Sequence, residues 1–211
     1  MIKKRLTIAH YSENLDWLGL INKNIEIFIY HKKNTNLLYN EKKEINKNEF
    51  ELCNTGRESH TYLKHIIDNY DNLSDIEFFC QGEPSEFPLF PHIVNEDIIP
   101  EYKQYSIFPK TFNSIKVKLT EHMVNPDHVR DYGYPDTIDI WNNLFDYEPP
   151  EIVKIIPHAF IKINKEKILM HDKKIYEKCL DYFSDGNKDN LYAWSFEYFW
   201  ALLFNNIHIK K

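Results

Sequence analysis

The sequence predicts an α/β protein, a single domain with a mostly parallel mixed sheet flanked by helices. Two observations carry this prediction. Short segments rich in β-branched and aromatic residues alternate with helical segments over roughly the first 80 residues. One of them, Ile76–Cys80, is apolar apart from Glu77, which is typical of a central strand covered on both faces.

The size and composition fit one globular domain. A chain of 211 residues with 43% hydrophobic and 15% aromatic residues has enough apolar surface for a core. The formal net charge of -6 argues against a broad nucleic-acid surface, because phosphate binding needs a surplus of Lys and Arg. The basic run His31–Lys33 is expected to be a solvated end.

The cysteine pattern and the N-terminus bear on the compartment. Three widely spaced cysteines without a Cys-x-x-Cys pair suggest neither a disulfide framework nor a cysteine zinc site. The apolar run near the N-terminus is too short for a signal peptide or a membrane span. We therefore expect a cytoplasmic protein without a transmembrane segment.

The first 53 residues predict three strands. Leu6–Tyr11 is the first, and Ser12–Ile21 follows as a turn and a short helix whose first turn holds acidic residues. Ile25–Tyr30 is the second strand, and Phe50–Cys53 is the third. The polar run His31–Asn48 between them has little periodicity and is expected to be a loop.

The segment Arg57–Tyr70 predicts an amphipathic helix. Its apolar residues recur at helical spacing and form one stripe, at Tyr62, Leu63, Ile66, Ile67 and Tyr70. The sequence DNLSD ends the helix, and the strand Ile76–Cys80 follows. We expect the stripe to pack on the sheet.

The second part of the chain is less regular. Residues Glu83–Tyr134 are rich in proline and aromatics and allow a helix near Asn95–Tyr102 and a strand at Ile115–Leu119. Two strands and three helices are then expected, at Glu151–Ile156, Ala159–Ile163, Asp136–Asp146, His171–Phe183 and Leu191–Phe204. The last, aromatic helix either packs internally or covers a partner.

Polar residues follow three of the predicted strands. In an open α/β sheet, ligands bind beyond the carboxyl ends of the strands. If the strands are parallel neighbours, their ends meet at one rim. The residues delivered there are His10, Tyr11, Ser12 and Glu13 from the first strand, Gly56, Arg57 and Glu58 from the third, and Gln81, Gly82 and Glu83 from the fourth.

Arg57 is the most informative of these residues. The N-terminus of a helix favours an anion, and a guanidinium adds bidentate pairing with phosphate. Gly56 would allow close approach of the backbone, and His60 in the first turn could reach a ligand. The alternative is a surface arginine that pairs with Glu58 or Asp68.

The remaining polar residues give weaker signals. Glu83 at a strand end can hold a divalent metal that bridges a diphosphate. His60 and His65 are five positions apart and do not share a helix face, so a two-histidine metal site is not expected; His65 is expected to face a loop or solvent. Cys80 is interpreted as a buried small hydrophobe. No catalytic Ser-His-Asp pattern and no glycine-rich phosphate loop is present.

Three segments resemble an uncharacterised domain family found in fungi and bacteria. They read HYSENLDWL, NTGRESHTYLKHIIDNYDNLSD and FFCQGEP, and the match to the second is close and specific. The resemblance continues less tightly at PHAFIKINKEKILMHDKKIYEKCLDYF and ends at SFEYFWALLF, so that it spans most of the chain.

The last two blocks and the opening strand and loop are also similar to glycosyltransferases of the GT-A fold. This resemblance implies a Rossmann-like nucleotide-sugar-binding half, at about residues 1–84, joined to an acceptor-binding half at about residues 85–211. It implies sugar transfer from a nucleotide-diphosphate donor to a glycan or glycoconjugate, in surface polysaccharide or glycoprotein assembly.

The resemblance also implies roles for individual residues. His10, Tyr11 and Glu13 would contact the base or ribose, and Gly56, Arg57, His60 and Gln81 would complete the donor site. Gln81–Glu83 stands where such enzymes carry Asp-x-Asp, so that Glu83 alone offers a carboxylate for Mn²⁺ or Mg²⁺. His158 replaces a small residue of the acceptor pocket. Glu197 is the expected catalytic base.

Two other classes of function remain open. A non-catalytic glycan- or protein-binding module on the same scaffold fits the missing Asp-x-Asp and the many aromatic residues, because aromatic faces stack on sugar rings. A metal-dependent hydrolase built on the histidines ranks last, since their spacing is not that of metal ligands.

Overall fold

The computed structural model describes residues 2–83, 94–95, 115–118, 137–148, 152–155, 160–187 and 190–205. They belong to two compact units, each described separately below. The first unit comprises Met1–Ile99 and Ala159–Asn190, and the second comprises Pro100–His158 and Leu191–Lys211. Residues 159–190 thus belong to the same compact unit as residues 1–99.

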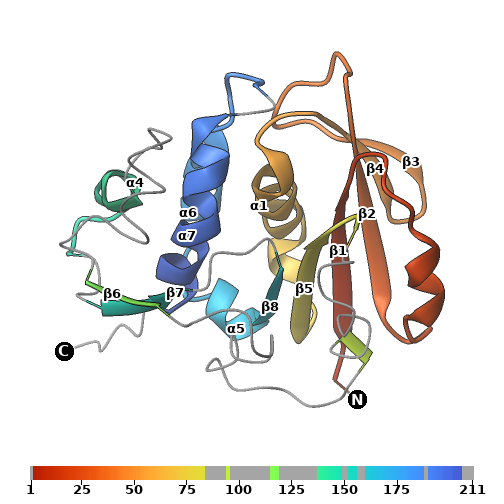
Figure 1. Cartoon of the computed structure of the whole chain (residues 1–211), viewed down its shortest axis with the longest axis horizontal. Coiled ribbons are helices and arrows are strands. Elements are labelled where there is room, and N and C mark those ends of the chain that lie inside the picture. Colours follow the sequence, from red (N-terminus) through yellow and green to blue (C-terminus); the bar gives the residue numbers. More distant parts are fainter. Residues whose placement is uncertain are drawn as a thin grey trace. The chain divides into compact units, whose positions relative to one another are not determined.

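The first unit is built on a six-stranded sheet of order β3-β4-β2-β1-β5-β8 (Figure 1). Strands β1, β2, β4 and β5 are parallel, and the edge strands β3 and β8 are antiparallel to their neighbours. This confirms the predicted α/β class with a mostly parallel mixed sheet. The strands span Lys4–His10 (β1), Glu26–Lys33 (β2), Lys43–Asn46 (β3), Glu49–Cys53 (β4), Ile76–Gln81 (β5) and Ile161–Asn164 (β8).

Strand β1 lies at the centre of this sheet. Leu6 pairs with Ile27 of β2 on one side and with Phe78 of β5 on the other. Leu6 and Phe78 are fully buried, as expected for parallel strands covered on both faces. The segment Ile76–Cys80 is buried, Glu77 included, and Cys80 is part of the core.

Helix α1 (Arg57–Asn69) packs its apolar stripe on the sheet, and the 3-10 helix η2 (Tyr70–Asn72) continues it. The ring of Tyr62 lies 5.0 Å from that of Phe79 on β5, and the ring of His65 lies 5.0 Å from that of Phe28 on β2. Figure 1 shows α1 running alongside the strands. The helix predicted from periodicity is confirmed, whereas the expectation for His65 is wrong, because its ring is buried between helix and sheet.

The segment between the second and third predicted strands is more ordered than expected. Strand β2 continues to Lys33, and β3 (Lys43–Asn46) forms an antiparallel edge. Lys32 is 4% exposed, so the run His31–Lys33 is not a solvated end. The groups that accept from Lys32, the Thr55 carbonyl and His60, come from later in the chain, so the residues around Lys32 do not show them.

The remaining helices of the first unit are short. The 3-10 helix η1 (Asp16–Leu20) follows β1, as the sequence predicts. Helices α5 (Lys165–Ile168) and α6 (Lys173–Asp181) follow β8, and α6 packs on α1. The buried Tyr176 of α6 donates from its hydroxyl to the carbonyl of Ile168 in α5 at 2.7 Å.

The second unit contains a two-stranded antiparallel sheet of β6 (Ile115–Lys118) and β7 (Ile152–Ile155), with α4 (Thr137–Leu144) and α7 (Leu191–Asn205). Helix α7 contacts both β7 and α4. Phe196, Phe199 and Trp200 are buried, with the ring of Phe196 5.5 Å from that of Trp200. The aromatic helix therefore packs internally. The helix expected near Asn95–Tyr102 lies largely outside the described residues.

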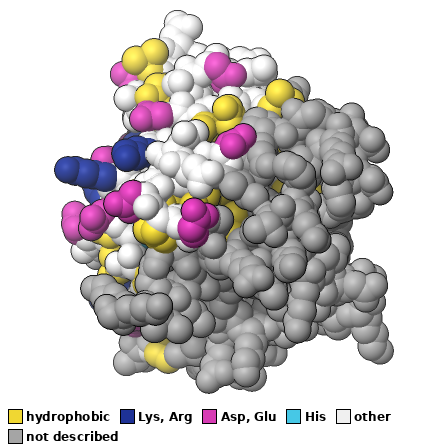
Figure 2. All heavy atoms as spheres, turned by 90° about the vertical axis from the view of Figure 1, so that its left-hand side faces the viewer, with side chains coloured by type: hydrophobic (Ala, Val, Ile, Leu, Met, Phe, Trp, Pro, Cys, Tyr) yellow, Lys and Arg dark blue, Asp and Glu magenta, His cyan; other side chains and the backbone are white. Residues whose placement is uncertain are grey.

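None of the described helices is long and apolar enough to cross a lipid bilayer. On the face drawn in Figure 2, acidic side chains of the described residues are dispersed among apolar and neutral ones, while Lys and Arg gather at one margin.

Candidate functional site

The strand order places a topological switch point between β1 and β5. The chain moves from β1 outward to β2 and β4, and then crosses back to place β5 on the other side of β1. The loops that leave the carboxyl ends of β1 and β5 therefore diverge, and such a crevice is where open α/β sheets bind ligands. The residues predicted for these two ends come together there.

The turn after β1 is organised by the carboxylate of Glu13. The backbone N–H groups of Tyr11 and Ser12 both donate to Glu13 Oε2, at 2.7 and 3.0 Å. His10 Nε2 lies 3.0 Å from the Glu13 carbonyl oxygen. Two converging backbone amides make a small anion-binding concavity, and here the protein's own carboxylate occupies it.

The turn lies against the end of β5. A methyl group added at Gly82 would come 2.5 Å from Glu13 Oε2, so only glycine leaves room for this carboxylate. Trp17 of η1 donates from Nε1 to the Gly82 carbonyl at 2.9 Å. The Gln81 side chain donates to the Glu83 carbonyl at 3.3 Å and shapes the same loop. The two strand ends and η1 are thereby held together.

Gly56 and Arg57 lie farther from the switch point than the sequence suggests. They follow β4. Strand β2 lies between β4 and β1, so β4 and β1 are two strand spacings apart, roughly 10 Å in total. Both residues have left-handed backbone, with φ of 56° and 49°. The Gly56 N–H donates to the Asn187 carbonyl at 3.1 Å, and a methyl group at Gly56 would overlap the Phe183 ring. Packing within the unit accounts for this glycine.

Arg57 itself begins α1 and is half-buried. Of the two acids considered as its alternative partners, Asp68 pairs with Lys42 and Lys64, at 2.8 and 2.6 Å. Glu58 is half-buried, and burial raises the pKa of its carboxyl group. A phosphate contact by Arg57 stays a prediction.

His60 lies in the interior of the first unit. Its Nε2 lies 2.6 Å from the Tyr39 carbonyl, and its Nδ1 lies 2.7 Å from Lys32 Nζ. The Tyr39 carbonyl accepts only, so Nε2 carries the proton and Nδ1 accepts from Lys32. Burial and the nearby Lys32 charge hold the pKa of His60 well below its ordinary value. Both ring nitrogens are thus engaged within the protein, which argues against a ligand contact.

Lys32 is the most perturbed cation of this interior. Its Nζ also donates to the Thr55 carbonyl at 2.7 Å. Burial lowers the pKa of Lys32 from 10.5 to about 7, and this outweighs the attraction of Cys53 and Glu58. Lys32 is not among the residues predicted from the sequence, although it is in phase with the buried Phe28 and Tyr30 of the same strand.

The depressed pKa of Lys32 predicts a stability that rises with pH. Above about pH 7 the unfolded chain binds a proton at Lys32 that the folded chain does not hold, so the free energy of unfolding rises with pH. We expect a gain on the order of 1 kcal/mol between about pH 7 and about pH 8.5. Urea unfolding at several pH values should show this slope in the wild type and lose it in Lys32→Met. Lys33→Met, at an exposed neighbouring position, should retain it; equal slopes in all three would contradict the assignment.

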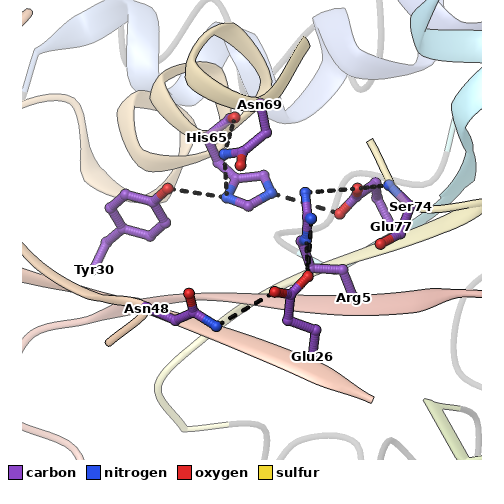
Figure 3. Close-up of polar contacts among 8 residues, drawn as sticks. All are labelled: Arg5, Glu26, Tyr30, Asn48, His65, Asn69, Ser74 and Glu77. Atoms are coloured by element: carbon purple, nitrogen blue, oxygen red, sulfur yellow. Dashed lines mark hydrogen bonds and ion pairs between the residues drawn. The ribbon is translucent and has the colours of Figure 1, made fainter. Parts of the chain in front are cut away.

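A buried polar network lies beneath α1 (Figure 3). Arg5 Nη2 lies 2.8 Å from Glu26 Oε2, and Arg5 Nη1 lies 3.5 Å from Glu77 Oε1. Glu77 also accepts from the Ser74 N–H at 2.7 Å, and Tyr30 shares a 3.0 Å hydrogen bond with His65 Nδ1. Burial lowers the pKa of His65, which favours the neutral ring. Since Arg5 and Glu77 are buried, the network joins helix to sheet and does not face a ligand.

The other predicted site residues are less constrained. Glu83 lies at the end of the described loop after β5. Among the described residues, no group of three or more His, Cys, Asp or Glu side chains is placed to hold a metal ion. Glu197 is half-buried on α7 of the second unit, and its role as a base stays a prediction. His158 lies outside the described residues.

Comparisons with known proteins place the chain in a family. Neither the curated proteins nor the solved structures gave a match. A family profile described as "Protein of unknown function (DUF3431)" matches residues 6–210, nearly the whole chain. The chain therefore belongs to the DUF3431 family.

Proposed function

We propose that the protein binds a nucleotide-diphosphate sugar at the carboxyl ends of β1 and β5 and transfers the sugar to a glycan or glycoconjugate. One observation carries the proposal: the Glu13 turn and Gly82 meet at the point where the strand order reverses. Crevices of this kind bind nucleotides in open α/β sheets.

The groups at the switch point suit a nucleoside. The Tyr11 side chain is 51% exposed beside the turn, and its ring offers a face on which a base can stack. The Glu13 carboxylate has lone pairs beyond those that accept from the two backbone amides, and ribose hydroxyl groups are donors for them. In this assignment Gln81 and Gly82 form the floor under the ribose.

The diphosphate is assigned to groups farther along the same rim. Arg57 at the start of α1 would supply a guanidinium, and the α1 N-terminus adds the partial positive charge of its free amides. Glu83 would hold a divalent metal together with the diphosphate oxygens if the reaction uses Mn²⁺ or Mg²⁺. His60 is not part of this assignment, because its nitrogens are engaged elsewhere.

Isothermal titration with uridine, guanosine and adenosine diphosphates and their sugar conjugates, in EDTA and in Mn²⁺, tests the proposal. We expect one nucleotide class to bind. Slow hydrolysis of the matching donor would identify a transferase, whereas binding without turnover in the presence of metal would favour a glycan-binding module. No binding by any nucleotide would overturn the assignment.

Gly82→Ala should abolish most of this binding. The added methyl group displaces the Glu13 carboxylate from the Tyr11 and Ser12 amides, because it would lie 2.5 Å from Oε2. We expect affinity to fall at least about tenfold, or about 1.4 kcal/mol, while the melting temperature changes little. Gly19→Ala is the matched control, since its methyl group would meet nothing within 4 Å. Equal affinity in the two variants would contradict the Glu13 site.

A further inference from the structure

Two histidines face each other near the carboxyl ends of β1 and β2, next to the turn that contains Glu13. His10 ends β1 and is in register with His31 of the parallel strand β2. Their Nδ1 atoms are 2.8 Å apart, and the rings meet edge to face at 4.9 Å between centroids. Two nitrogens at this distance form a hydrogen bond only when one of them carries a hydrogen and the other does not.

The surrounding acceptors fix which nitrogen carries it. His10 Nε2 lies 3.0 Å from the Glu13 carbonyl oxygen, which only accepts, so His10 is protonated at Nε2. In the neutral ring, His10 Nδ1 is then the acceptor, and His31 donates to it from Nδ1. A continuous path of hydrogen bonds thus joins β2 to the turn through His10.

His31 has one further site for a proton. Its Nε2 is buried, has no hydrogen-bond partner, and lies 3.7 Å from Glu49 Oε2. A first proton bound there faces the Glu49 carboxylate and leaves the contact with His10 intact. A second proton must bind His10 Nδ1, and it then places two N–H groups and two positive charges against each other.

Some of the groups around His31 favour its protonation and others oppose it. Glu49 of β4 favours a proton on His31, while burial, His10 and Lys33 of β2 lower the pKa of His31. The Glu13 Oε2 atom lies 4.0 Å from His10 Nε2. Because the two rings interact so closely, they take up protons in two steps that belong to the pair.

We propose that His10 and His31 form a pH-sensitive clasp that holds the Tyr11–Glu13 turn, and that the second proton opens it. Opening removes the hydrogen bond to His31 and repels the His10 ring from β2. The turn then loses its link to β2 and keeps only its contacts with the end of β5, so the Glu13 carboxylate is held less firmly on the Tyr11 and Ser12 amides. The release of the turn stands by itself, whereas its effect on nucleotide binding rests on the proposed function.

Nuclear magnetic resonance of the ligand-free protein tests the clasp. We expect the imidazole nitrogens of both histidines and the Tyr11 and Ser12 amides to change together, in one transition as the pH is lowered. Across it, amide exchange at Tyr11 and Ser12, corrected for its intrinsic pH dependence, should accelerate at least about tenfold.

Two variants separate the clasp from general acid unfolding. His31→Asn takes up no proton; its amide can donate to neutral His10 and, turned over, can accept from protonated His10, so the turn should stay closed through the pH range in which the wild type opens. His31→Phe keeps a ring but has no donor, so the two amides should exchange rapidly at every pH. Glu44→Gln, an exposed change on β3, is the control and should behave as the wild type.

The results of these measurements separate the clasp from the proposed nucleotide site. Amides of Tyr11 and Ser12 that do not follow the histidine titration, or an unchanged opening pH in His31→Asn, would overturn the clasp. Titration of the best nucleotide across the transition then measures the link to the site, where affinity should fall as the turn opens. If no nucleotide binds at any pH, the proposed function fails while the resonance measurement still decides the clasp.

Discussion

Gly56→Ala is expected to lower the free energy of unfolding by about 2 to 5 kcal/mol. Two costs combine. The backbone at Gly56 is left-handed, with φ of 56°, which costs an alanine roughly 1 to 2 kcal/mol. The added methyl group would also overlap the buried ring of Phe183, and overpacking of this kind costs roughly 1 to 3 kcal/mol.

Urea unfolding monitored by circular dichroism measures this effect. Gly19→Ala serves again as the control, since its methyl group enters open space, and its stability should change by less than about 0.5 kcal/mol. If Gly56→Ala were as stable as the control, the close packing of Gly56 on Phe183 would be refuted.

Arg5→Met should be the second severely destabilising change, with an expected loss of about 3 to 5 kcal/mol. Arg5 is 3% exposed and Glu77 is fully buried, so the variant leaves a carboxylate inside the protein without its cation. The guanidinium also lies 4.7 Å from the centre of the Phe28 ring, and this contact is lost as well.

A double-mutant cycle isolates the ion pair from the other contacts. Arg5→Met combined with Glu77→Met removes both charges and should recover most of the stability lost in Arg5→Met, because apolar pairs of similar volume often replace buried ion pairs at little cost. Lys33→Met, which breaks an exposed pair with Glu51, should cost less than about 1 kcal/mol. Strictly additive losses at Arg5 and Glu77 would show that the two charges do not interact.

The helices and strands that could be predicted are those that the apolar pattern of their own residues determines. The stripe of Tyr62, Leu63 and Ile66 defines α1 because helical spacing gathers apolar side chains on one face. The apolar residues of β5, interrupted only by Glu77, define a central strand for a similar reason. Both inferences need no information about distant residues.

Features that depend on distant partners were missed or misplaced. Lys32 is buried because the Thr55 carbonyl and His60 accept from it, and neither is visible in the sequence around Lys32. The switch-point residues Glu13 and Gly82 were predicted from strand ends, and the strand order brings them together. The same order separates Gly56 from them by the width of β2, which no local pattern specifies.

Strand β8 has a consequence for how the chain folds. It pairs antiparallel with β5, so that Phe79 lies opposite Ile161, although much of the second unit's sequence stands between them. Closing so long a loop is entropically costly and tends to slow folding. While the chain is being made, β1, β2, β4 and β5 can assemble early, but β5 keeps an open edge until residues 161–164 leave the ribosome. During that interval the nascent protein offers a row of unsatisfied backbone groups to other chains, and protection from aggregation depends on its late-arriving strand.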